Sequence, residues 1–142
     1  MFKYCMKLQM IKITFLLFLC ISIHACKTES ARPDDALGTA RAFIRYSLDG
    51  EFKQADELML EDSINRQELE QIKKRYQNDL SKQEKLSFQK ASIIIHTVDQ
   101  LNDSIVVINY SNSYTKKQMP IKVIRRNDLW QVDLQYTFSG NL

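Results

Sequence analysis

The sequence has little of the residue types on which many catalytic and nucleotide-binding motifs depend. Its 142 residues include three cysteines, three glycines, two prolines and two histidines. So few glycines exclude a phosphate-cradling loop or a dinucleotide fingerprint, because those motifs need several glycines close together. His96 is the only histidine after residue 25, which excludes a site built from several histidines. The sequence therefore predicts no catalytic residue, no cofactor and no metal site.

The sequence also has little excess of one charge over the other. The formal net charge is +3, and Lys3, Lys7 and Lys12 near the start account for all of it. From Cys26 onward, basic and acidic residues are equal in number. A domain without net positive charge has no electrostatic footprint for a phosphate backbone, so nucleic acid is not an expected partner.

Long hydrophobic runs are limited to residues 13–23, which carry no charge, glycine or proline. The run has about 11 residues, which fits the hydrophobic core of a secretory signal peptide. It is shorter than the roughly 20 apolar residues that a membrane-spanning helix needs. The lysines before it keep the amino-terminal end on the cytoplasmic side. This segment is therefore predicted to direct export.

The residues that close this run, Ile23-His24-Ala25-Cys26, resemble the lipobox of bacterial lipoproteins. The resemblance implies that Cys26 receives a diacylglyceryl thioether and that a peptidase cleaves before it. A further acyl chain such as palmitate is then added to the freed amine. Two or more acyl chains hold a protein firmly on a membrane, whereas one binds only reversibly. The alternative is an ordinary signal peptide in which Cys26 is incidental.

The lipoprotein interpretation divides the chain into three parts. These are a signal peptide (residues 1–25), a polar tether (residues 26–33) and a domain (residues 34–142). The tether shows no hydrophobic periodicity and reads as a flexible linker. Lys27 stands where an acidic residue would retain some lipoproteins in the inner membrane. We expect the protein to be lipid-anchored in the cell envelope, with the outer membrane favoured over the inner membrane.

The first half of the domain has helical periodicity. Apolar residues recur three or four positions apart, and they predict three helices. The first begins at Asp35 and ends at Gly50, which is expected to form a left-handed cap. The second covers residues 52–59, and the third follows Asp62 and reaches Leu80.

The second half of the domain has a period of two. Strands are predicted at residues 92–98, 104–114, 119–126 and 129–138, and the last of these places every second residue from Trp130 to Phe138 on one face. One apolar and one polar face indicate an antiparallel sheet, and helices before strands indicate an α+β fold. The expected architecture is a set of N-terminal helices packed on a curved four-stranded antiparallel sheet.

Two stretches carry a resemblance to a known superfamily. Asp49-Gly50-Glu51-Phe52 with Ala55 resembles the connection between the first two helices of that superfamily. Its closing turn and final strand are matched by Asn127, Asp128, Trp130 and Val132. This is the nuclear transport factor 2 superfamily, and the resemblance implies a cone-shaped, cystatin-like fold. Small Bacteroidota-type lipoproteins of unknown function, some of them lumazine-binding-like, contain such domains. The motifs mark fold and packing, and they carry no chemistry.

Four side chains are candidates for lining a cavity between the helices and the sheet: His96, Tyr46, Tyr110 and Tyr136. The alternative for His96 is a core or rim histidine, and for the tyrosines it is ordinary packing. The expected function is a membrane-anchored, non-enzymatic domain that binds a ligand or an envelope protein. The alternative function is the binding of a small apolar or aromatic heterocycle in the cone, or simple acid–base chemistry there. A homodimer through the open sheet is a third expectation.

Overall fold

The computed structural model of the protein describes residues 32–138. The predicted signal peptide, Cys26 and the tether up to residue 31 lie outside the described residues. Residues 32–138 lie within one compact unit. No helix among residues 32–138 is long and apolar enough to span a membrane.

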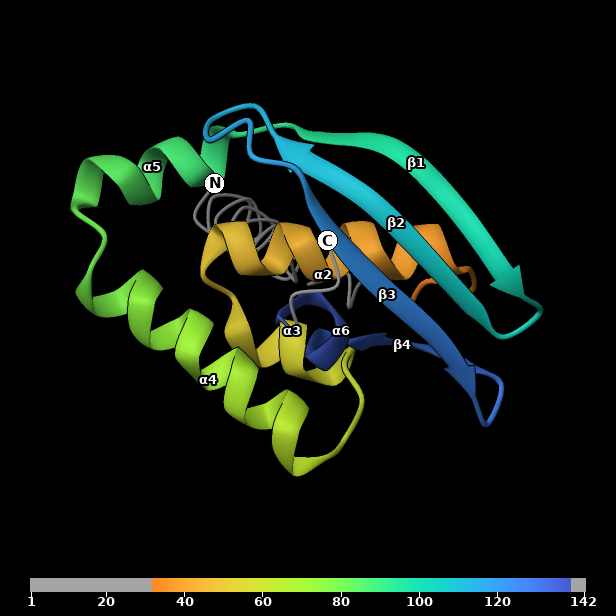
Figure 1. Ribbon diagram of the computed structural model, residues 1–142. Coiled ribbons are helices and arrows are strands. Elements are labelled where there is room, and N and C mark those ends of the chain that lie inside the picture. The colour runs from red at the N-terminus through yellow and green to blue at the C-terminus, as the bar shows by residue number, and fades with distance from the viewer. Residues whose placement is uncertain (1–31, 139–142) are drawn as a thin grey trace, which may run out of the picture. The chain divides into compact units, whose positions relative to one another are not determined.

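Four helices come first, four strands follow, and one short helix ends the described chain (Figure 1). The helices are α2 (Ala36–Asp49), α3 (Phe52–Glu57), α4 (Ser63–Asn78), α5 (Lys82–Lys90) and α6 (Leu134–Phe138). The strands are β1 (Ile93–Asn102), β2 (Ile105–Asn112), β3 (Met119–Arg126) and β4 (Leu129–Asp133). This order confirms the prediction of helices followed by a four-stranded antiparallel sheet.

The strands form one open antiparallel sheet in the order β1-β2-β3-β4. Val106, Val123 and Val132 align across β2, β3 and β4, and all three are buried. Together with Phe43 and Ile44 of α2, they belong to the hydrophobic core. Figure 1 shows α2 crossing this face of the sheet, with α3 and α6 beside it and α4 and α5 beyond.

Both ends of α2 follow from the sequence. The side chain of Asp35 accepts a hydrogen bond from the backbone N–H of Gly38 at 2.7 Å and so caps the first turn. Gly50 ends the helix in the left-handed conformation at φ 80°, as its position predicts. The short α3 then leads to Met59, which makes a parallel bridge to Val132 and covers the outer edge of β4.

Helix α4 begins where the sequence predicts, at a carboxylate cap. Asp62 accepts hydrogen bonds from the backbone N–H groups of Asn65 and Ile64 at 2.9 and 3.0 Å. These bonds, the one from Asn65 foremost, lower the pKa of the Asp62 carboxyl below its ordinary value. The cap therefore holds its negative charge at the positive end of the helix dipole.

Helix α5 was not predicted, because the apolar periodicity that marks the other helices is weak there. Its first turn is instead fixed by a capping box, in which Ser81 and Glu84 each bond the backbone of the other. None of its residues is buried. The strand that was predicted next begins at Ile93, close to its expected start.

The predicted fourth strand, residues 129–138, is wrong in its second half. β4 ends at Asp133, and residues 134–138 form α6. The backbone N–H of Leu134 bonds the Oδ1 atom of Asn65 at 2.6 Å instead of a neighbouring strand. Asn65 is 1% exposed and its Nδ2 atom donates to Asp62, so α4 holds this turn in place. Tyr136 and Phe138 consequently do not extend the sheet face that Trp130 and Val132 share.

Candidate functional site

A pocket of about 500 Å³ lies between the helices and the sheet in the part of the chain that the structure describes. Its inner wall consists of Phe43, Ile44, Ile121 and Leu134, each no more than 4% exposed. Further apolar lining comes from α2, α4, the α4–α5 connection, α5 and β3 through Leu48, Ile72, Leu80, Phe88 and Met119 respectively. The pocket is therefore an apolar space whose walls come from both layers of the fold.

Two hydroxyl groups in the pocket wall have no hydrogen-bond partner among residues 32–138. Tyr110 pairs with Met119 across β2 and β3 and faces the core, and burial raises the pKa of its phenol to about 12. The Oγ1 atom of Thr137, on α6, is buried and unpaired within the described residues. An unpaired buried hydroxyl costs free energy, so the Thr137 hydroxyl is available to a bound molecule or to water. The phenol of the half-buried Tyr110 can also donate to a bound molecule.

Two cations complete the lining. Arg75 comes from α4 and Lys117 from the connection between β2 and β3, and both side chains are exposed. Because the inner wall is buried, these exposed residues lie at the mouth of the pocket. No aspartate or glutamate is among the described lining residues. The pocket thus changes from apolar inside to positively charged at its opening.

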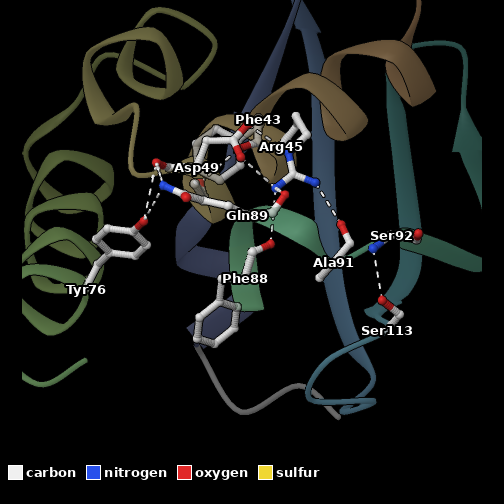
Figure 2. Close-up of polar contacts among 10 residues, drawn as sticks. Phe43, Arg45, Asp49, Tyr76, Phe88, Gln89, Ala91, Ser92 and Ser113 are labelled. Atoms are coloured by element: carbon white, nitrogen blue, oxygen red, sulfur yellow. Dashed lines mark hydrogen bonds and ion pairs between the residues drawn. The ribbon is translucent and has the colours of Figure 1, made fainter. Parts of the chain in front are cut away.

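The α5 side of the wall is held to α2 by Arg45. Its guanidinium makes two hydrogen bonds of 2.8 Å to the carboxylate of Asp49, and it donates to the backbone carbonyls of Phe88, Gln89 and Ala91 at 3.2, 3.1 and 2.8 Å. Figure 2 shows the guanidinium between Asp49 and the end of α5. Carbonyls at a helix end have few partners within the helix, and that of Phe88 also accepts from the N–H of Ala91 at 3.1 Å. The guanidinium bonds all three carbonyls and so positions Phe88. The Phe88 ring also meets Tyr114 edge-on, with centroids 5.0 Å apart.

Tyr76 places α4 against the end of α2. Its hydroxyl donates to the carbonyl of Asp49 at 3.3 Å (Figure 2). Its ring meets the Phe52 ring edge-on, with centroids 5.5 Å apart. A Cβ atom on Gly50 would lie 2.6 Å from the Tyr76 ring. The glycine is therefore needed for its left-handed conformation and also for the close approach of this lining residue.

Of the four predicted pocket residues, Tyr110 lines the pocket and the other three are not among its lining residues. Tyr46 packs against the core, and the Tyr136 ring lies 5.5 Å from the ammonium of Lys122. His96 is exposed, with its Nε2 atom 2.9 Å from the Oγ atom of Ser111.

The position of His96 has a specific cause. The register between β1 and β2 shifts at this residue, so Ile94 pairs with Ser111 and Val98 pairs with Ile108. Those two partners lie on opposite faces of β2, because side chains alternate along a strand. An uninterrupted period of two would place Ile94, His96 and Val98 on one face, and the bulge prevents this.

Sequence reasoning missed most of the pocket, including Phe88, Arg75 and Thr137. Phe88 lies on the unpredicted α5, although the Ser81-x-x-Glu84 pattern was a readable sign of a helix start. Thr137 lies on α6, which replaced a predicted strand. Arg75 lies among charged residues of α4 and is exposed, and the sequence offered no sign that this part of the helix borders a pocket.

Comparison of the chain with protein-family models, curated proteins and solved structures finds no match.

Proposed function

We propose that this protein is a membrane-anchored lipoprotein of the cell envelope whose domain binds a small apolar molecule without transforming it. The pocket of about 500 Å³ is the observation that carries the proposal of ligand binding. Its size lies within the range of roughly 300–1,000 Å³ that is usual for small-molecule sites. Its wall is mostly apolar, with a small number of polar groups that would orient a ligand.

The polar groups of the pocket favour binding over acid–base chemistry. A general base must be able to take a proton near neutral pH. The described lining includes hydroxyl groups and an amide, from Tyr110, Thr137 and Asn112, but no carboxylate or imidazole. The raised pKa keeps the Tyr110 phenol protonated, so it would act as a hydrogen-bond donor to a ligand.

The proposal includes the anchor and the family. Cys26 would carry the acyl chains, the preferred location is the outer membrane, and the domain would belong with the cone-shaped, cystatin-like domains of the nuclear transport factor 2 superfamily. The order of helices and antiparallel strands supports this assignment, as do the left-handed Gly50 and the Asn127-Asp128 turn, whose φ angles are 51° and 61°.

Pocket binding is tested by photolabelling the full chain in phospholipid nanodiscs with a diazirine derivative of dodecanol. We expect labels on the peptides that contain Phe88 or Tyr110, and we expect unlabelled dodecanol to compete. Ile72→Trp should remove most of this labelling, because Ile72 lines the pocket and an indole would fill it. Ile64→Trp is the matched control, since Ile64 is 46% exposed on the same helix.

Two photolabelling outcomes would contradict binding in the pocket. Labelling that spreads over the surface, or that persists in an Ile72→Trp variant with an unchanged circular dichroism spectrum, would show that the pocket is not the binding site. If the Ile72→Trp variant does not fold, the unmodified protein alone still tests the proposal. Unlabelled dodecanol that fails to reduce labelling of the peptides containing Phe88 or Tyr110 would then contradict binding in the pocket.

The anchor is tested by intact-mass measurement of the protein purified from bacterial membranes. We expect a chain that begins at Cys26 and carries the mass of its acyl chains. Cys26→Ser should retain the leader and carry no acyl mass, whereas Cys20→Ser should behave like the unmodified protein. An unmodified protein with a bare Cys26 thiol would contradict the anchor.

A further inference from the structure

We infer that the ligand of the pocket carries an anionic head, which Arg75 and Lys117 hold at the mouth. The inference rests on the proposed function, because it assigns a chemical class to the ligand of the same pocket. The ligand is an amphiphile with a single apolar chain that ends in a carboxylate or a phosphate.

The first observation is that two cations from distant segments border one pocket. Arg75 lies in the last turn of α4, and Lys117 lies between β2 and β3. Within residues 32–138, neither forms an ion pair with a carboxylate. Asp79 follows Arg75 by one helical turn, and only its backbone N–H contacts Arg75, at the carbonyl. Both positive charges are therefore free to attract an anion.

The neighbouring charges increase this attraction. The ammonium of Lys85 lies 5.6 Å from the ring centroid of Tyr76, which is itself a lining residue. The side of the domain next to the pocket thus presents a third cation.

The second observation is the change of polarity along the pocket. Its inner wall is apolar and almost fully buried, so an ionised group placed there would lose its hydration without a compensating charge. An apolar chain gains free energy by entering the same space. Only a ligand that is apolar at one end and anionic at the other matches both regions.

Two sources could supply this chemistry. A free fatty acid has a carboxylate head, and a phospholipid that has lost one chain has a phosphate-containing head. Guanidinium and ammonium groups bind both kinds of oxyanion. The common feature, one chain and one anionic head, is what the pocket selects.

The experiment measures competition in the photolabelling assay described above. Dodecanoate, dodecanol and dodecyl lysophosphatidate compete with the neutral probe for the full chain in uncharged nanodiscs. The double variant Arg75→Gln/Lys117→Gln is compared with Lys74→Gln/Lys90→Gln, which removes two exposed cations that do not line the pocket. Both variants have the same net charge, so general attraction of anions to the protein cancels.

We expect the Arg75→Gln/Lys117→Gln variant to lose about three- to tenfold of its affinity for the anionic competitors, the range typical of losing two exposed ion pairs. Dodecanol should compete equally with all three proteins, and added salt should weaken only the anionic competitors. Stronger competition by dodecanoate than by lysophosphatidate would identify a fatty acid as the ligand, and the reverse would identify a single-chain phospholipid.

The opposite results separate the two proposals. If dodecanol and the anions compete equally, and the Arg75→Gln/Lys117→Gln variant behaves like its control, the inference about the head group is wrong while pocket binding stands. If no competitor displaces the probe from the pocket, the proposed function fails and the head-group inference fails with it.

Discussion

Replacing Arg45 with glutamine would remove the contact that fastens the end of α5 to α2. The guanidinium donates five hydrogen bonds, two to the carboxylate of Asp49 and three to backbone carbonyls at the end of α5. A glutamine amide is shorter and has two N–H donors, so it cannot replace them. The change therefore tests whether this one side chain holds the Phe88 wall of the pocket.

The expected loss follows from the exposure of the contact. The Arg45 and Asp49 side chains are 33% and 29% exposed, so their ion pair contributes only about 0.5 kcal/mol. The three bonds to carbonyls contribute about 0.5 kcal/mol each, at the low end of the usual range because water replaces part of them. The free energy of unfolding should fall by about 2 kcal/mol, which lowers the melting temperature of a domain of this size by about 8 °C.

Thermal unfolding of the full chain, followed by circular dichroism, measures this loss. Arg45→Lys should lose about half as much, because an ammonium keeps the charge but not the planar fork. Arg41→Gln is the control: Arg41 is exposed on the same helix, and its substitution should change stability by less than about 0.5 kcal/mol. A melting temperature for Arg45→Gln equal to that of Arg41→Gln would refute the reasoning. Faster hydrogen exchange confined to α5 would show where the support was lost.

Three further predictions concern the turn at α6, the close approach at Gly50 and the buried phenol. Asn65→Ala leaves the Leu134 N–H without its partner and should lower the free energy of unfolding by about 2 kcal/mol, as measured by denaturant titration. A change below about 0.5 kcal/mol would contradict this role for Asn65. Gly50→Ala forces a positive φ on alanine and places its Cβ against the Tyr76 ring. It should lower the free energy of unfolding by more than about 1 kcal/mol and weaken photolabelling. Unchanged labelling and stability would disprove the close approach. Because the pKa of Tyr110 is raised from 10.0 to about 12 in the folded state, its contribution to stability is complete below pH 10 and is lost as the pH rises toward 12. Tyr110→Phe should therefore lose less stability over that interval, and equal losses in both proteins would argue against a buried phenol.

The order of the elements was predictable because its signals are local. The spacing of apolar residues in α2, the carboxylate before α4, and the left-handed Gly50 each act within one or two helical turns. The same is true of the Asn127-Asp128 turn, where both residues have positive φ. Local signals of this kind placed the described part of the chain in the α+β class.

Two of the failures occurred where an effect that the local pattern does not contain overrides it. Alternating apolar residues predicted that the last strand continues to Phe138, but Asn65 bonds the backbone of Leu134 from 69 positions away. The single extra residue at His96 reverses the faces of β1, because the side-chain period of a strand is two. Neither effect leaves a mark in the sequence of the strand that it changes.

The sequence by itself determined that helices precede four antiparallel strands, and that a charge-balanced stretch follows the hydrophobic run of residues 13–23, because each of these depends on neighbouring residues. Only the tertiary structure decided that there is a pocket and which side chains border it. Arg75, Lys117, Tyr110 and Thr137 belong to four separate segments. Their proximity depends on how α4 and α6 pack against the sheet, and that packing is set by contacts between residues far apart in the chain.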